Sequence, residues 1–244
     1  MDEKPSYLDL ILDIFFNYKE DSLKDVEKME NDFKSIDDKY LNYLSFDYSL
    51  RINKIKESIL NNEKLLLDIM DKYKINYNKI KSKINPSRKL SEINKLRSTL
   101  KLFIRDWTIE GKKERDLTYT PIITEIKKYF SNTSNQKILI PGAGLCKLAF
   151  ELAKLGFEVD AIEVSYYMIL CTNFIFNSHL NKNKYQIQPL IHSFNCLKNE
   201  DDPFQLFNFP DENIDEIMKR KDFGQLNIIP GDFVLSFKDK NNRN

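Results

Sequence analysis

A glycine-containing turn and one glutamate are the residues of this sequence best suited to binding a small ligand. Residues 137–140 form an apolar run, and Gly142 and Gly144 follow it in the sequence Pro-Gly-Ala-Gly-Leu. A second strand is expected over residues 157–162, and it ends at Glu163. Glycines let backbone N–H groups approach a ligand closely, and a carboxylate at the end of the next strand can accept hydrogen bonds from both ribose hydroxyls. The pattern therefore predicts a site for an adenosyl ligand.

The position after the second glycine distinguishes two adenosyl ligands. A dinucleotide site usually carries G-x-G-x-x-G, whose third glycine lets helix and strand pack beside a pyrophosphate. Lys147 stands at that third position here. S-adenosylmethionine has no phosphates, so this departure favours it over NAD. The remaining alternative is a glycine turn in an ordinary α/β domain without a ligand, and no metal site is predicted.

A third candidate segment is Gly231-Asp232-Phe233, which follows the strand-like residues 226–230. An aspartate after a strand can accept a hydrogen bond from the adenine amino group, and the neighbouring ring can contact the adenine edge. Taken alone, Gly-Asp-Phe is a common turn. In this order along the chain it supports the adenosyl interpretation.

The elements that must position these residues change character near residue 135. Five of the six glycines follow that point, as do the β-rich runs. The change predicts a helical region over residues 1–131, an α/β region over residues 136–237 and a polar tail over residues 238–244. The expected helices cover residues 7–18, the residues from Arg51 to a stop at Pro86, residues 90–110 before Gly111, and a segment from an N-cap at Thr120 through Pro121 to Phe130.

Composition and charge exclude several classes of protein. Lys and Arg number 38 against 37 acidic residues, a net charge of +1 that argues against nucleic-acid or anionic-membrane binding. No segment approaches the roughly 20 apolar residues of a membrane span, and the first residues lack the pattern of a signal peptide. The three cysteines form no C-x-x-C pair and are expected to be reduced thiols. We expect a cytoplasmic protein, with the nucleus as a second expected location.

Together these segments resemble the carnosine N-methyltransferase family, also described as N2227-like. The order and approximate spacing of the matching pieces are kept from near Phe15 to Phe237. The matching pieces are Leu96-Arg97-Ser98-Thr99-Leu100-Lys101, Phe103-Ile104-Arg105-Asp106-Trp107, Glu110-Gly111-Lys112, Glu114-Arg115-Asp116, Tyr119-Thr120-Pro121-Ile122-Ile123, Ile140-Pro141-Gly142-Ala143-Gly144-Leu145, Glu163-Val164-Ser165-Tyr166-Tyr167-Met168, Asn173-Phe174, Asn177, Pro189-Leu190-Ile191-His192-Ser193-Phe194 and Gly231-Asp232-Phe233.

The resemblance implies an α/β fold in which an N-terminal helical bundle precedes an S-adenosylmethionine-binding, Rossmann-like class I methyltransferase domain. It implies an imidazole nitrogen of a histidine-containing dipeptide or peptide, such as carnosine, as the methyl acceptor. The helical region is also a candidate homodimer surface. The implied cofactor-binding residues are Arg105, Gly142, Gly144, Glu163, Asp232 and Phe233. A guanidinium suits the cofactor's carboxylate, although an exposed ion pair with Asp106 is the alternative role for Arg105.

Two positions depart from the family's pattern, since Leu102 stands where the family has Gln and Cys146 where it has Gly. Both bear on the affinity for the cofactor. The family's substrate and catalytic residues lie mostly after its Asp-Phe pair, so the catalytic residues stay unassigned and His192 is expected to support the structure. The Rossmann-like domain is accordingly expected to be incomplete and to lack its catalytic C-terminal half. The alternatives are a non-catalytic cofactor-binding protein and a helical interaction protein derived from the family.

Overall fold

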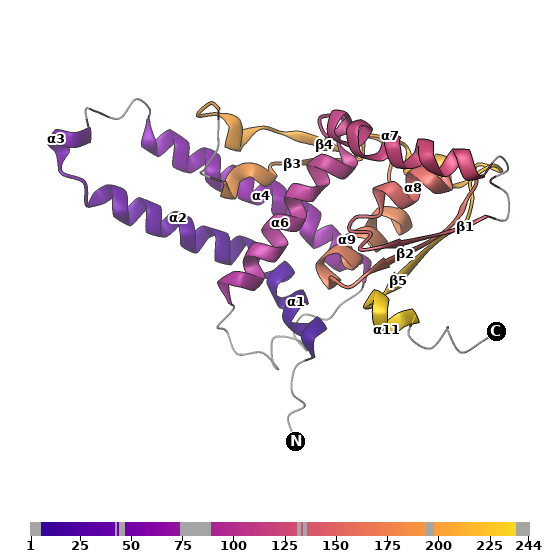
Figure 1. The fold of residues 1–244 in the computed structure, drawn as a ribbon. Coiled ribbons are helices and arrows are strands. Elements are labelled where there is room, and N and C mark those ends of the chain that lie inside the picture. The colour runs from indigo at the N-terminus through magenta and orange to yellow at the C-terminus, as the bar shows by residue number, and fades with distance from the viewer. Residues whose placement is uncertain are drawn as a thin grey trace, which may run out of the picture. The chain divides into compact units, whose positions relative to one another are not determined.

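The computed structural model of the chain describes residues 6–41, 43, 47–73, 89–130, 133, 136–193 and 198–237 (Figure 1). Contacts divide the chain into two compact units, the first made of residues 1–98 and 186–207 and the second of residues 99–185 and 208–244. The two units are defined by contacts between residues, whereas the boundary predicted from the sequence was based on composition. The boundary placed near residues 131–136 from the sequence therefore stays a prediction.

Helices make up most of the first unit. They are α1 (Tyr7–Phe16), α2 (Tyr18–Lys34), α3 (Asp38–Leu41), α4 (Tyr48–Lys72) and the 3-10 helices η1 (Pro189–His192) and η2 (Asp202–Phe204). The α2 and α4 helices lie side by side in Figure 1. The apolar positions that predicted α4 are buried, among them Ile52, Ile55, Ile59, Leu66 and Ile69. Their spacing of three and four residues places them on one face, which explains why a charged sequence forms a helix here.

Side-chain caps fix where two of these helices begin. The Ser6 hydroxyl accepts a hydrogen bond from the Asp9 backbone N–H, and the Asp9 carboxylate accepts one from the Ser6 N–H. The Asp47 carboxylate accepts from the Leu50 N–H and starts α4 three residues before the predicted start. The predicted stop at Pro86 lies outside the described residues.

A buried polar network in the first unit contains His192. Its Nε2 lies 2.8 Å from the Tyr18 hydroxyl, and the Asn62 amide donates to the same hydroxyl at 3.0 Å. Asn62 also exchanges hydrogen bonds with the backbone of Gln188. Burial raises the pKa of Tyr18 to about 12, so this hydroxyl stays protonated. The position of His192 in this network agrees with a structural role.

The second unit contains a parallel sheet. Its strands are β1 (Lys137–Pro141), β2 (Glu158–Glu163) and β5 (Leu226–Pro230), and its helices include α7 (Lys112–Tyr129), α8 (Lys147–Ala153), α9 (Tyr166–Asn177), α10 (Ile214–Met218) and α11 (Phe233–Phe237). The α6 helix (Leu90–Trp107) ends in this unit. Short strands β3 (Tyr185–Ile187) and β4 (Phe207–Phe209) form a separate two-stranded sheet.

The order of the parallel strands is β1-β2-β5, with β2 in the centre (Figure 1). Lys137 pairs with Glu158 and Glu163 pairs with Pro230 in the two ladders. This is the 3-2-1 order of one half of a doubly wound fold, in which ligands bind beyond the carboxyl ends of the strands. Within the described residues β1 forms one edge of the sheet, and Leu139 on it is 38% exposed.

The helix predicted to open at Thr120 and Pro121 was placed too late. The α7 helix begins at Lys112, directly after Gly111, and Pro121 lies inside it. A Cβ at Gly111 would stand 2.2 Å from the Ile104 carbonyl and 2.3 Å from the Arg105 carbonyl, so the turn from α6 into α7 is tight. Tertiary contacts of the first turn of α7 thus outweigh the preference of proline for the start of a helix.

The predicted strand, glycine turn, helix, strand and third strand are confirmed as a parallel α/β arrangement. This arrangement is compatible with a Rossmann-like methyltransferase domain. The arrangement of the N-terminal helices as a bundle stays a prediction.

Candidate functional site

The turn between β1 and α8 alternates left-handed backbone positions. Gly142 has φ of 64°, Gly144 has φ of 58° and Cys146 has φ of 58°. The Ala143 N–H donates to the Ile162 carbonyl at 2.9 Å, which ties the turn to the end of β2. A glycine adopts such φ values without strain, whereas the Cβ of Cys146 costs roughly 1 kcal/mol. The structure thus explains why a glycine would suit position 146.

The side chain of Cys146 is fully buried, with its sulfur 3.9 Å from the Gly144 carbonyl oxygen. Burial, with smaller contributions from the negative charges of Glu163 and Asp106, raises the pKa of this thiol to about 12. The thiol is therefore neutral and packs beneath the turn, so it does not crowd the solvent-facing side of the turn.

Glu163 is the last residue of β2 and is tied to the glycine turn. One carboxylate oxygen, Oε2, accepts from the Gly144 N–H at 2.8 Å, and Oε1 accepts from the Ser165 N–H at 2.8 Å. Its side chain is 8% exposed. A carboxylate oxygen has about two acceptor sites, so each oxygen keeps one for a ligand hydroxyl.

The Gly231-Asp232-Phe233 segment comes to the same edge of the sheet. The Gly231 N–H donates to the Glu163 carbonyl at 2.9 Å. The Asp232 carboxylate accepts from the Leu235 N–H at 3.0 Å through Oδ1, and both Asp232 and Phe233 are exposed. The sequence-predicted residues Gly142, Gly144, Glu163, Asp232 and Phe233 are therefore gathered where the three parallel strands end.

The space around Gly142 and Gly144 shows whether a ligand could lie against the glycine turn. A Cβ built at Gly142 or at Gly144 meets no atom within 4 Å. The left-handed glycines thus border open space beside the Glu163 carboxylate. These residues fit an adenosyl ligand with a ribose near Glu163 and its aliphatic part over the glycines.

Arg105 lies in the last turn of α6, and its neighbour Trp107 anchors that turn to the glycine motif. The Trp107 indole N–H donates to the Leu145 carbonyl at 3.1 Å, and the side chain is fully buried. Arg105 does pair with Asp106, with Nε 2.6 Å from Oδ1. The alternative of an exposed pair is wrong in one respect, because the Asp106 side chain is only 2% exposed.

A cluster of buried and half-buried charges beside α7 and α8 was not predicted from the sequence. It consists of Arg115, Lys147, Lys154, Asp211 and Glu212. The Arg115 guanidinium pairs with the Asp211 carboxylate and also donates to the Arg105 and Thr108 carbonyls at 2.5 and 2.7 Å. Lys147, the residue that replaces the third glycine, is 1% exposed and lies 4.5 Å from the centre of the Trp107 ring. The cluster thus joins the end of α6 to the start of α8.

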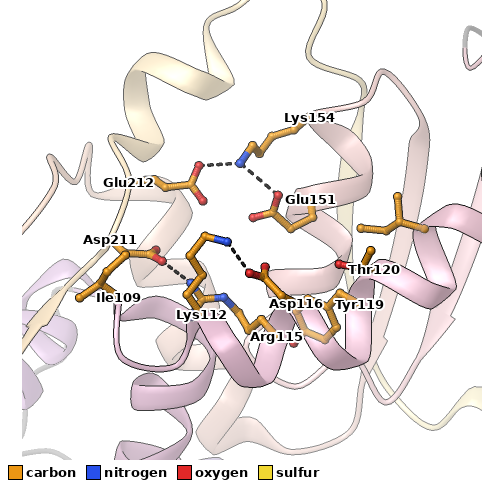
Figure 2. Close-up of a pocket in the computed structure, with 11 residues that line it drawn as sticks. Ile109, Lys112, Arg115, Asp116, Tyr119, Thr120, Glu151, Lys154, Asp211 and Glu212 are labelled. Carbon is orange, nitrogen blue, oxygen red and sulfur yellow. Dashed lines mark hydrogen bonds and ion pairs between the residues drawn. The ribbon is translucent and has the colours of Figure 1, made fainter.

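A pocket of about 430 Å³ opens beside this cluster, as Figure 2 shows. Lys154 reaches both Glu151 and Glu212 there, and Lys112 pairs with Asp116. Each of these charges has a partner of opposite sign in the pocket wall. The pocket wall is therefore charged but internally paired, and its lining residues differ from those that border the open space above the glycine turn.

Glu212 makes the stability of this cluster depend on pH. Burial alone would raise its pKa, but the ammonium groups of Lys147 and Lys154 outweigh burial and lower the pKa to about 2 from 4.5. A depressed pKa in the folded state means that the stabilisation is present above about pH 4.5 and is lost as the pH falls toward 2. After allowance for solvent screening we expect it to be worth about 1–2 kcal/mol.

The matching experiment is urea unfolding of wild type and Glu212→Gln between pH 7 and pH 3. We expect the variant to be less stable by about 1–2 kcal/mol at pH 7, with the difference shrinking as the pH falls. A difference that is constant with pH would contradict the assigned cause.

Within the described ranges no helix is long and apolar enough to cross a membrane. Those ranges also hold no group of three or more His, Cys, Asp or Glu side chains placed to bind a metal ion.

Comparison with known proteins identifies related chains. A family profile described as Carnosine N-methyltransferase matches residues 82–244. The carnosine N-methyltransferase of Mus musculus is 33% identical over 241 residues, which cover 95% of this chain and 59% of the mouse protein. The Drosophila melanogaster protein carnosine N-methyltransferase unmet is 41% identical over 155 residues, 62% of this chain and 33% of the fly protein. A carnosine N-methyltransferase of Schizosaccharomyces pombe is 34% identical over 155 residues, 62% of this chain and 41% of the yeast protein. The chain thus spans less than two thirds of the length of these relatives.

Proposed function

Because the chain belongs to the carnosine N-methyltransferase family, we propose that it binds S-adenosylmethionine at the glycine turn and that the protein methylates an imidazole nitrogen of a histidine-containing dipeptide or peptide. The observation that carries the proposal is the meeting of Gly142, Gly144, Glu163 and Gly231 at the carboxyl ends of three parallel strands. S-adenosylmethionine, when bound, supplies an electrophilic methyl group on its sulfonium sulfur.

Different residues of this chain would bind different parts of the cofactor. Glu163 would accept hydrogen bonds from the ribose hydroxyls through its remaining acceptor sites. Asp232 and Phe233 would contact the adenine, one through a hydrogen bond and the other through its ring. Arg105 would bind the carboxylate of the methionine part, because a guanidinium matches a carboxylate in shape and charge. The two glycines leave room for the ligand.

Calorimetry and a transfer assay test the two halves of the proposal. We expect S-adenosylmethionine and S-adenosylhomocysteine to bind and NAD to bind far more weakly. In the transfer assay, one methyl group gained by carnosine from S-adenosylmethionine, with none gained by β-alanyl-alanine, which has no imidazole, would support the methylation half of the proposal. Cofactor binding without methylation of carnosine would favour the second candidate, a non-catalytic cofactor-binding protein. Preference for NAD would overturn the cofactor assignment.

Substitution of Gly144 by alanine is expected to weaken cofactor binding. The φ of 58° at Gly144 makes a Cβ cost roughly 1 kcal/mol, and that Cβ would enter the space assigned to the ligand. We expect the affinity for S-adenosylhomocysteine, measured by calorimetry, to fall by about tenfold or more. Gly156→Ala is the matched control, because Gly156 also has a left-handed φ of 92° but lies beyond the end of α8. The control should lose stability and keep its affinity, whereas equal losses of affinity in both variants would count against this placement of the ligand.

A further inference from the structure

The guanidinium of Arg105 is held in one orientation by its chain neighbour. Its Nε lies 2.6 Å from Oδ1 of Asp106 and its Nη2 lies 3.0 Å from Oδ2. Adjacent residues of a helix normally point in different directions, so such a two-point contact depends on the geometry at the end of α6. The Asp106 side chain is 2% exposed and the Arg105 side chain is 38% exposed. The carboxylate is thus the buried, fixed partner of the pair.

Asp106 is itself held by α7. The Tyr119 hydroxyl donates to Oδ1 of Asp106 at 3.1 Å. Burial raises the pKa of Tyr119, and the negative charge of Asp106 raises it further, so the hydroxyl remains a neutral donor. Two oxygens of Asp106 therefore accept from Arg105 while one of them also accepts from Tyr119. This leaves the carboxylate little freedom to turn.

The backbone of Arg105 is fixed as well. The Arg115 guanidinium donates to the Arg105 carbonyl at 2.5 Å. The Trp107 indole ties the same turn of α6 to Leu145 in the glycine motif.

One edge of the guanidinium is left for a ligand. Arginine has five N–H donors, and Asp106 engages Nε and Nη2. Within the described residues Nη1 has no hydrogen-bond partner, so the Nη1 and Nη2 edge can face an acceptor. That edge matches a carboxylate through two parallel hydrogen bonds.

We propose that Asp106 is a positioning residue, which holds the Arg105 guanidinium with its open edge toward the carboxylate of the bound cofactor, supported by the Tyr119 hydroxyl. The inference rests on the proposed function. A guanidinium that is already oriented loses less freedom when the ligand binds, and an unrestrained long side chain weakens binding by roughly tenfold.

Two ligands separate this role from a merely structural one. S-adenosylhomocysteine carries the amino-acid carboxylate, whereas 5′-methylthioadenosine has the same adenosine part without it. We expect Asp106→Asn to bind S-adenosylhomocysteine about tenfold more weakly and 5′-methylthioadenosine with unchanged affinity. Tyr119→Phe removes a single hydroxyl, and we expect a smaller loss, about threefold, with the same selectivity.

Arg105→Met provides the reference for the pair. We expect it to lose more affinity for S-adenosylhomocysteine than Asp106→Asn does, and we expect Asp106→Asn to add no further loss on the Arg105→Met background. Circular dichroism and thermal unfolding identify any variant that fails to fold. If Asp106→Asn does not fold, the ligand selectivity of Tyr119→Phe tests the positioning role.

Equal losses for the two ligands, or a loss that adds fully to that of Arg105→Met, would overturn the positioning role while leaving the proposed function intact. Wild-type protein that binds neither ligand would overturn the proposed function, and the positioning role with it.

Discussion

Replacement of Glu163 by glutamine is expected to lower the affinity for S-adenosylhomocysteine by about 100-fold. Hydrogen bonds to a charged group contribute about 1.5–3 kcal/mol each, and the carboxylate is assigned two ribose hydroxyls. The amide would also turn an –NH2 group toward the backbone N–H of Gly144 or Ser165, where each carboxylate oxygen now accepts. Both effects act on the free energy of binding, which calorimetry measures directly.

Asp160→Asn is the control for this substitution. Asp160 lies on the same strand, accepts a hydrogen bond from the Asn227 amide at 2.8 Å and pairs with Lys137 at the start of β1. The control should keep wild-type affinity. If Glu163→Gln binds the ligand as tightly as Asp160→Asn does, Glu163 does not hold the ribose.

Replacement of Arg115 by methionine is expected to lower the free energy of unfolding by about 3–5 kcal/mol, since removal of one partner of a buried ion pair is strongly destabilising. Among the described residues, only Lys147, at 3.4 Å, would then remain to compensate the buried Asp211 carboxylate. The Arg115 and Asp211 side chains are 7% and 5% exposed. Methionine also removes the donors to the carbonyls at the end of α6. Urea unfolding measures the loss.

Lys128→Met on the same helix is the matched control. Lys128 pairs with Glu125, and the two side chains are 64% and 55% exposed. Such a surface pair is worth at most about 1 kcal/mol, so the control should remain close to wild type. Similar losses for the two variants would mean that the Arg115 pair does not stabilise the end of α6.

The part of the site that the sequence predicted consists of local features. The β1 and β2 strands, the turn between them and the position of Glu163 at the end of β2 all follow from apolar runs and two glycines within residues 137–163. Such patterns depend on neighbours along the chain, so one sequence reveals them. The β5 strand before Asp232 was visible for the same reason.

The rest of the site depends on contacts between residues that are distant in sequence. Arg115 and Asp211 are 96 residues apart, and Lys147 lies 64 residues from Asp211. Neither the residue types nor their spacing in the sequence indicates that these side chains form ion pairs. The start of α7 was misplaced for a similar reason. The hydrogen bonds of Arg115 hold the first turn of α7 against the end of α6, and these contacts outweigh the preference of Pro121 for the first turn of a helix.

The two roles that the sequence suggests for Arg105 are compatible with each other. The sequence offered a cofactor contact or an ion pair with Asp106. The structure contains the ion pair, yet Asp106 is buried and leaves the Nη1 edge of the guanidinium for another acceptor. An ion pair that orients Arg105 is consistent with both the cofactor contact and the pair with Asp106. The burial of the Asp106 carboxylate allows both roles, and no sequence pattern indicates that burial.

A crystal structure of the protein with S-adenosylhomocysteine tests the central claim most directly. We expect the ribose hydroxyls within hydrogen-bond distance of the Glu163 carboxylate, the methionine part over Gly142 and Gly144, and the ligand carboxylate on the open edge of Arg105. A ligand bound instead in the charged pocket between α7 and α8, with the space above the glycine turn filled by solvent, would contradict the account.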